Sequence, residues 1–309
     1  QALQDRIAAR LSRDKMDATA LALRGRRRLH RGEYEPAVAD LAASFEARKD
    51  PDVRRLLVQA LLDGLRSDYS RYADQATRLE TLLASDDEQL AFRRLRAAGL
   101  SRTGKVVEAF DEYLKLCHSA DQKTTSTPQP PPPPQPPQPP KLPNSAGSAQ
   151  RGQLETINED LGVRRTYWVA SQLIGVDRRA TASQKTVLAA RRKTLFDEAG
   201  AVEVAPSTVA LQQFVTLFDG HPIADRARVK LLERFARNTP AVQRERLLLA
   251  LRAAVDPAVA GRATSELAAL WSAQQKPAAI AVLRDELESG RFAGVELAPG
   301  RTGQATVAA

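Results

Sequence analysis

Few side chains of this sequence are suited to catalysis. The single cysteine, Cys117, is followed by His118, and a cysteine beside a histidine is one form of nucleophile–base pair. Adjacent residues of a helix do not face each other, so this pair does not predict catalysis. The other histidines, His30 and His221, lie far apart, and there is no P-loop, GxGxxG, HExxH or GxSxG motif. We therefore expect no enzyme activity, no catalytic residue, no metal site and no cofactor.

A second group of side chains is suited to binding carboxylates. Small residues recur at Gly25, Ala60 and Ala97, and cationic residues stand near each of them. The cationic set is Arg26, His30, Arg54, Arg94 and Arg102. Guanidinium forks pair bidentately with carboxylates, so the set predicts a binding site for an acidic peptide. The alternative is that an arginine-rich helical protein carries arginine on every face. Glu33, Asp63 and Glu108 are the candidates for pairing internally with this set.

The elements that must position these cations are helical hairpins. Residues 17–31 and 34–48 are predicted as two helices joined at Gly32-Glu33-Tyr34, with small residues at Gly25, Ala37 and Ser44. Two antiparallel helices approach closely only where small side chains lie at the crossing. This pattern resembles the tetratricopeptide (TPR) family. The resemblance implies stacked hairpins whose first helices line a concave groove, and it places the cationic set in that groove.

Two further hairpins follow. The second begins at Asp52, turns at Ser67-Asp68-Tyr69 and continues as one helix to about Ala84. The third runs from about Asp86 to Cys117, with a turn at Gly104. The turn positions recur close to the period of about 34 residues that is typical of TPR repeats. A short amphipathic helix at residues 2–12 precedes the first hairpin.

Residues 120–152 differ in composition. Thr127 to Pro143 is mostly proline, which lacks an amide donor and fixes φ, so this tract favours neither helix nor sheet. A polyproline II segment is a semi-rigid spacer of about 3.1 Å per residue. The tract also fits the PxxP pattern of ligands for proline-recognising domains. Both interpretations stay open.

Helical patterns resume after the proline-rich tract. The predicted helices are 154–174, 182–199, 206–218, 222–238, 240–255, 256–275 and 276–288. The sequence thus predicts an all-α fold with essentially no sheet, a TPR-like α-α hairpin solenoid in two arrays. The arrays are 1–119 and 153–291, separated by the linker 120–152 and followed by a tail, 292–309, of coil or a lone strand.

The second half carries a further resemblance. It is carried by Val163-Arg164-Arg165-x-x-Trp168, by Asp219-Gly220-His221-Pro222 and by the hairpins. Together these features resemble the helical region that precedes a PQQ-like β-propeller in bacterial envelope proteins. Thr302-Gly303 resembles the turn of a propeller blade, although Pro299 stands where that motif has aspartate. The resemblance implies a propeller beyond Ala309 and no PQQ-binding residue in this chain.

Composition limits the function classes. The net charge of +9 is spread over both halves of the 309 residues, which argues against nucleic acid as a partner. No apolar run approaches the ~18 residues of a membrane span. The chain begins with Gln1, so we expect a piece of a larger protein. These observations predict a non-enzymatic helical-repeat scaffold that binds a protein or an acidic peptide. The alternative is a recruiting or regulatory segment of an enzyme whose catalytic domain lies outside this chain. The propeller resemblance implies the periplasm or cell envelope; without it, the cytoplasm is expected.

Overall fold

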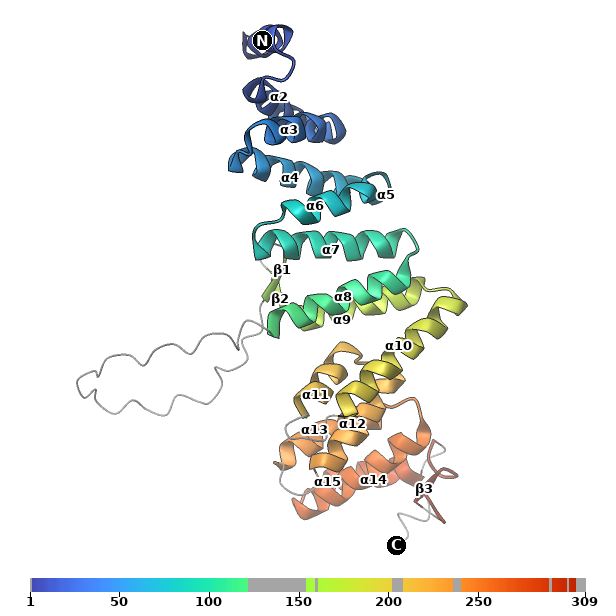
Figure 1. Ribbon diagram of the computed structural model, residues 1–309. Helices are drawn as coiled ribbons and strands as arrows, with labels where there is room; N and C mark the ends of the chain where they lie inside the picture. The colour runs from blue at the N-terminus through green and yellow to red at the C-terminus, as the bar shows by residue number, and fades with distance from the viewer. Residues whose placement is uncertain are drawn as a thin grey trace, which may run out of the picture. The chain divides into compact units, whose positions relative to one another are not determined.

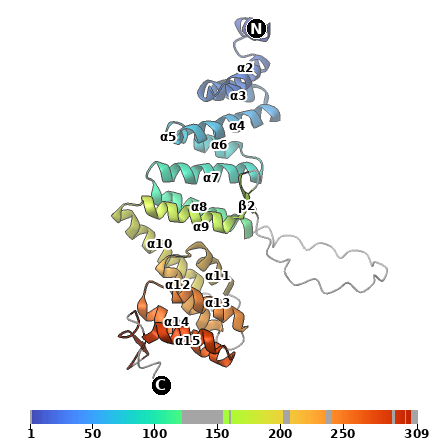
Figure 2. The same ribbon diagram turned by 180° about the vertical axis from the view of Figure 1, so that it is seen from behind.

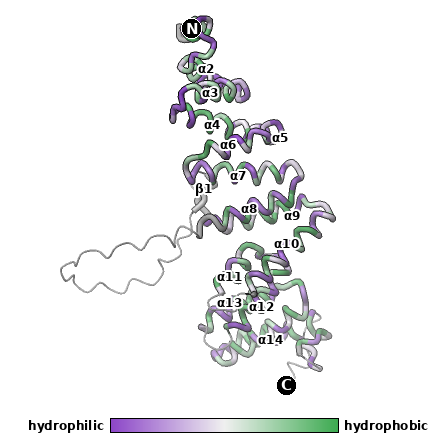
Figure 3. Tube along the Cα trace, viewed as in Figure 1, coloured by the Kyte–Doolittle hydropathy of each residue, from purple (hydrophilic) through white to green (hydrophobic). Residues whose placement is uncertain are grey.

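The described part of the chain is all-α, as the sequence predicts. The computed structural model describes residues 2–121, 154–158, 161–201, 208–235, 240–288, 291–298 and 300–303. Most of the predicted linker 120–152 lies outside the described residues, and its first two residues close a helix. Figure 3 shows hydrophobic and hydrophilic residues alternating along the helices, the pattern of elements that bury one face.

The chain divides into two compact units, Gln1–Lys185 and Thr186–Ala309. In the first unit the helices lie side by side in chain order (Figure 1 and Figure 2). Its elements are α1 (Ala2–Arg13), α2 (Ala18–His30), α3 (Tyr34–Arg48), α4 (Pro51–Ser67), α5 (Tyr69–Tyr72), η1 (Ala73–Gln75), α6 (Ala76–Leu82), α7 (Asp86–Arg102), α8 (Val106–Asp121), β1 (Leu154–Asn158), β2 (Leu161–Arg164) and α9 (Arg165–Arg179).

Local sequence explains where these helices begin and end. The Asp17 side chain accepts a hydrogen bond from the backbone N–H of Ala20 at the start of α2. Ser85 and Glu88 form a reciprocal capping box at the start of α7. Gly32 and Gly104 follow α2 and α7 with φ of 74° and 80°, a conformation that glycine adopts without strain. Both glycines stand at the turns that the sequence predicts.

The first hairpin is held by close packing and by polar contacts. A Cβ placed on Gly25 of α2 would lie 2.6 Å from Cγ of Leu41 on α3, so this position admits no side chain without displacement. Leu41 is fully buried. At the open end of the hairpin, the Ser44 hydroxyl donates to the backbone oxygen of Ala18 at 2.7 Å.

The second hairpin departs from the prediction of one helix from Tyr69 to about Ala84. The segment is broken into α5, η1 and α6. The ring of Tyr72 packs against Gly64 of α4, with its nearest ring atom 3.2 Å from the place of a glycine Cβ. The ring of Tyr69 packs still closer to Gly99 of α7. Tyr72 thus stands where the first hairpin has the small residue Ala37, and the helix that carries it is interrupted.

The predicted helix 154–174 is wrong over its first half. Residues Leu154–Asn158 and Leu161–Arg164 form an antiparallel pair, β1 with β2, with Leu154 opposite Arg164 and Thr156 opposite Gly162. The β-branched residues of this stretch favour strands, and Gly162 disfavours a helix. The helix predicted over these residues is therefore wrong, while the all-α class with very little strand holds for the described residues.

Helix α9 packs on α8 within the first unit. The rings of Tyr113 and Trp168 meet edge to face with centroids 5.9 Å apart. The Arg179 guanidinium donates to the Ser101 hydroxyl at 2.9 Å, and the Gln184 side chain donates to the backbone oxygen of Gly104 at 2.9 Å. These contacts place residues up to Lys185 with the first unit, whereas the predicted second array begins at 153.

The second unit is also helical. After α10 (Ala182–Ala201), which begins in the first unit, come α11 (Thr208–Leu217), α12 (Pro222–Phe235), α13 (Ala241–Arg252), α14 (Pro257–Ala273), α15 (Pro277–Glu288), β3 (Glu296–Ala298) and β4 (Arg301–Thr302). Leu248, Leu251, Leu267 and Leu283 form a core between α13, α14 and α15.

The expected coil tail contains packed structure. Phe292 is fully buried in a second cluster with Leu297 and Leu287. A Cβ on Gly261 of α14 would lie 2.3 Å from the Leu297 side chain, so a glycine lets this segment approach the helix. Strands β3 and β4 pair antiparallel, where coil or a lone strand was expected.

Candidate functional site

Arg26 and His30 are the members of the predicted cationic set that stay open to solvent on α2. Both side chains are exposed. Neither forms a hydrogen bond or an ion pair with any residue that the structure describes. They are one turn apart on the same helix and are free to meet an external carboxylate.

Arg54 is instead used between helices. Its two terminal nitrogens donate to the two Glu88 carboxylate oxygens at 3.0 and 3.1 Å, and Nη1 also donates to the backbone oxygen of Leu82 at 2.7 Å. The hydrogen bonding from Arg54 lowers the pKa of Glu88, and this effect outweighs burial, which raises it. Arg54 therefore joins α4 to the start of α7. Glu88 is not among the acids predicted to pair with the cationic set, although the Ser85-x-x-Glu88 spacing is typical of a capping box.

Arg94 and Arg102 also differ from the predicted groove. The Arg94 guanidinium carbon lies 5.7 Å from the centroid of the Trp168 ring on α9, and burial lowers the pKa of Arg94, with a further contribution from Arg165. The exposed Arg102 donates from Nε to the backbone oxygen of Ala98, one turn earlier, at 3.4 Å.

A different group of arginines on α2 converges on one carboxylate. Asp40 of α3 is 5 % exposed and accepts from Arg24 Nε at 2.8 Å and Arg24 Nη2 at 2.7 Å. It also accepts from Arg28 Nη1 at 2.7 Å, and Arg28 donates to the backbone oxygen of Pro36 at 3.3 Å. The Asp40 carboxylate raises the pKa of Arg24. Two guanidiniums thus share one negative charge, which leaves an excess positive charge beside α3.

The same arginines border a cavity of about 660 Å³ between α1 and α2. We call it the arginine pocket; its lining residues used below are Asp5, Ile7, Ala8, Leu11, Arg24, Arg27, Arg28, Arg31 and Glu33. Ile7 is 6 % exposed and anchors α1. The C-terminal end of α1 is tied to the start of α2 by Arg10, whose Nε lies 2.7 Å from an Asp17 carboxylate oxygen. The pocket combines an apolar side with a row of cations, which suits a ligand of mixed acidic and apolar character.

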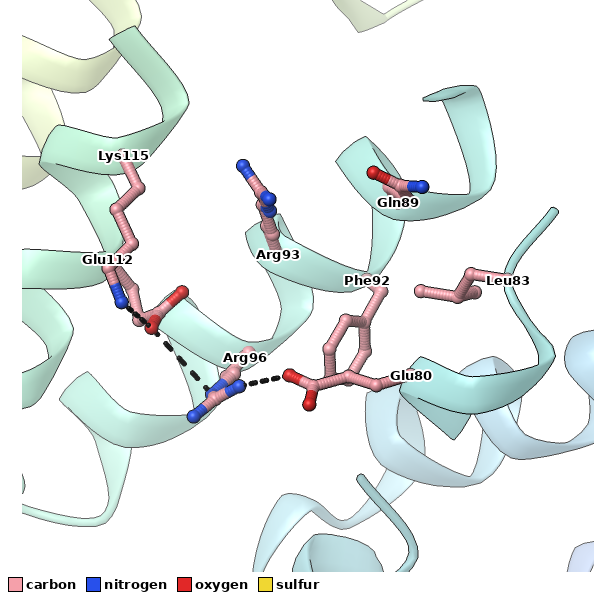
Figure 4. Close-up of a pocket in the computed structure, with 8 residues that line it drawn as sticks. All are labelled: Glu80, Leu83, Gln89, Phe92, Arg93, Arg96, Glu112 and Lys115. Carbon is pink, nitrogen blue, oxygen red and sulfur yellow. Dashed lines mark hydrogen bonds and ion pairs between the residues drawn. The ribbon is translucent and has the colours of Figure 1, made fainter. Parts of the chain in front are cut away.

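A smaller cavity of about 260 Å³ lies among α6, α7 and α8 (Figure 4). Its charged residues largely satisfy each other. Arg96 pairs with Glu80 and lies 3.9 Å from Glu112, and Lys115 lies 2.8 Å from the same Glu112 carboxylate. Figure 4 shows Arg93 projecting from α7 on the same side. The network links three helices, and its internal pairing makes this cavity a weaker candidate than the arginine pocket.

Residue types that commonly support metal binding do not cluster in the described chain. No group of three His, Cys, Asp or Glu side chains close enough to hold a metal ion occurs among the described residues. Within the same residues, no helix combines the length and the apolar character needed to cross a membrane. Cys117 is half-buried and takes part in no disulfide bond with a described residue.

The chain matches no protein-family model, and comparisons with curated proteins and with solved structures find no match either.

Proposed function

We propose that this chain is a non-enzymatic, TPR-like helical-repeat scaffold whose first unit binds an acidic protein segment or peptide. The observation that carries the proposal is the charge of α2. Its residues Arg24, Arg26, Arg27 and Arg28 are cationic, and the helix contains no acidic residue. Asp40 compensates only part of this charge.

The exposed positive surface of α2 favours a partner with several carboxylates. A single exposed ion pair contributes only about 0–1 kcal/mol, so one carboxylate would bind weakly. A peptide that engages several guanidiniums together gains from charge-assisted, bidentate hydrogen bonds. Because the attraction between exposed charges is screened over about 8 Å at physiological ionic strength, binding should weaken as salt is added.

The test is a titration of the full chain with two peptides of matched length, one of alternating Glu and Leu and one of alternating Ser and Leu, at low and high salt. The acidic peptide should bind, with an affinity that falls with salt. A charge-reversed variant, Arg26→Glu with Arg27→Glu, should lose this binding. The matched control is Arg55→Glu with Arg66→Glu on α4, where each arginine is exposed and pairs with an acid of its own helix.

Two results would count against the proposal. The first is equal affinity of the parent chain for the acidic and the neutral peptide. The second is equal loss of binding in the α2 variant and in the α4 control, because that would reflect net charge alone rather than a surface on α2.

The end of the described chain supports a second role for the same scaffold, the docking of a neighbouring domain. Strands β3 and β4 form an antiparallel pair in which β3 packs on α14, and Thr302-Gly303 at its end resembles the turn of a propeller blade. The test is the sequence of the complete gene. Repeated Ala-x-Asp-x-x-Thr-Gly segments would support a propeller parent in the bacterial envelope, and hydrolase or kinase motifs would favour the recruiting segment of an enzyme.

A further inference from the structure

We infer that the arginine pocket between α1 and α2 is the recognition site for the acidic partner, and that it takes a segment in which carboxylates flank an apolar side chain. This inference rests on the proposed function and deepens it, because it names the surface and the chemistry of the ligand. It replaces the predicted groove, in which Arg54 and Arg94 are already used between helices.

The spacing of the pocket arginines sets them in one row. Arg24, Arg27, Arg28 and Arg31 follow each other at intervals of three, one and three residues, the spacing of neighbours along one helical face. All four line the pocket, together with only two acidic residues. A ligand that enters the pocket therefore meets a continuous cationic wall.

The charge of this wall is only partly compensated by the protein. Arg24 and Arg28 share the Asp40 carboxylate. Arg31 lies 4.0 Å from Glu33, and both of these side chains are about half exposed. Arg27 has no ion pair with any described residue. Ligand carboxylates would supply the missing negative charge.

Two of the arginines are held in place before a ligand arrives. Asp40 orients Arg24 through Nε and Nη2 and Arg28 through Nη1. Ordering a long side chain on binding costs conformational entropy, and a side chain that is already ordered avoids much of this cost. A guanidinium carries five N–H donors, so Arg24 Nη1 and Arg28 Nη2 still have donors that no described residue accepts.

The opposite side of the pocket favours a peptide over a nucleic acid. It is formed by Ile7, Ala8 and Leu11 of α1, which offer apolar contact to a side chain. None of the described lining residues is aromatic, so no ring is available to stack on a base. Asp5 and Glu33 would repel a chain of phosphates, while a peptide can place its carboxylates away from them.

The size of the pocket agrees with this occupant. A volume of about 660 Å³ is larger than a single side chain requires. It lies within the range of about 300–1,000 Å³ that is usual for ligand sites. A short acidic segment with one apolar side chain directed at Leu11 would fill it and reach several of the arginines.

The experiment compares two double variants of the full chain on the same helix. Arg27→Gln with Arg31→Gln alters the pocket and leaves the contacts of Asp40 intact, whereas Arg26→Gln with His30→Gln alters the exposed residues of the predicted groove. Both are titrated with the alternating Glu–Leu peptide and with an alternating Glu–Ser peptide. The pocket variant should lose about tenfold or more in affinity for Glu–Leu, as expected when charge-assisted hydrogen bonds are removed. The groove variant should change little, and the parent should prefer Glu–Leu to Glu–Ser.

A third variant, Ala8→Trp, tests the cavity without removing a charge. Ala8 is an exposed residue of α1, so the added ring should fill the pocket and weaken Glu–Leu binding while circular dichroism stays that of a helical protein. If Arg26→Gln with His30→Gln abolishes binding and the pocket variant does not, the inference is wrong and the proposed function stands. Equal affinity for the two acidic peptides, or unchanged binding by Ala8→Trp, would also overturn the inference. If the parent chain binds no acidic peptide, the proposed function itself fails.

Discussion

Replacing Gly99 by alanine is the sharpest test of the packing in the first unit. Gly99 is buried in α7, and a Cβ placed on it would lie 2.0 Å from Cδ2 and 2.1 Å from Cγ of the Tyr69 ring. Non-bonded carbon atoms prefer separations of about 3.5–4.0 Å. The Tyr69 ring is almost fully buried, so it cannot move aside without disturbing the contact between α5 and α7.

The expected change in the free energy of unfolding is the sum of two opposed effects. Alanine is favoured over glycine in a helix interior by about 1 kcal/mol. Overpacking a core costs about 1–3 kcal/mol, and so severe an overlap belongs at the upper end of that range. The expected net result is a loss of about 2 kcal/mol in the free energy of unfolding of the first unit. For a domain of this size, that corresponds to a fall of about 4–8 °C in Tm.

Gly175→Ala is the matched control. Gly175 lies inside α9 of the same unit, and an added Cβ would meet nothing within 4 Å. Only the helix-propensity term applies, so Tm should rise by about 2–4 °C. The two substitutions are chemically identical, so the difference of about 3 kcal/mol between them isolates the clash with Tyr69.

The assay is thermal unfolding followed by tryptophan fluorescence in a Trp271→Phe background. The chain has two tryptophans, and Trp168 then reports on the first unit alone. Equal shifts of Tm for Gly99→Ala and Gly175→Ala would refute the described approach of α5 to α7. A Tyr69→Ala background provides a second check, because removing the ring should make Gly99→Ala neutral or stabilising.

Other substitutions test the remaining contacts of the first unit. Gly25→Leu should lower the free energy of unfolding by about 1–3 kcal/mol through overpacking. Arg26→Leu, on the exposed side of the same helix, should change it little. Equal melting temperatures of the two variants would place Gly25 away from the helix crossing. Asp40→Ala should cost about 1.5–3 kcal/mol in denaturant titrations because it removes the buried carboxylate that accepts hydrogen bonds from two partly exposed guanidiniums; a cost near that of an exposed pair would contradict the described burial of Asp40. Glu88 has a pKa below its ordinary value of 4.5 because of Arg54, so it stabilises the fold above pH 4.5 and this stability is lost as the pH falls through the lowered pKa. Glu88→Gln should therefore flatten the dependence of stability on pH below about 4.5, and an unchanged acid profile would mean that this pair does not form.

The sequence was sufficient to predict the helical class and the turns of the first and third hairpins. Gly32 and Gly104 stand at those turns with positive φ, because local conformational demands are recorded in single residue types. It did not predict the break at Ala73–Gln75, because that break depends on where the Tyr69 and Tyr72 rings pack on other helices. Periodicity also failed at 154–164, where strand pairing outweighed an apparent helical stripe.

Only part of the candidate site could be predicted from the sequence. The amphipathic helix at residues 2–12 was expected, and its apolar residue Ile7 is buried. Which arginines face that helix could not be read from spacing alone, because α2 carries cations on more than one face. The pairing of Arg54 with Glu88 joins residues 34 positions apart, and only the packing of α4 on α7 brings them together.

The docking of α9 on α8 has a consequence for synthesis of the chain. Tyr113 is nearly inaccessible in the folded unit and lies against Trp168 of α9. Translation of the stretch between Asp121 and Arg165 takes about 2–9 s at about 5–20 residues per second. Helical proteins rich in local contacts fold in about microseconds to milliseconds, so the preceding hairpins have time to pack before their neighbour emerges. For those seconds the nascent chain presents an aromatic surface that only its own later residues will cover, and we expect this interval to be the one in which the newborn protein most depends on chaperones.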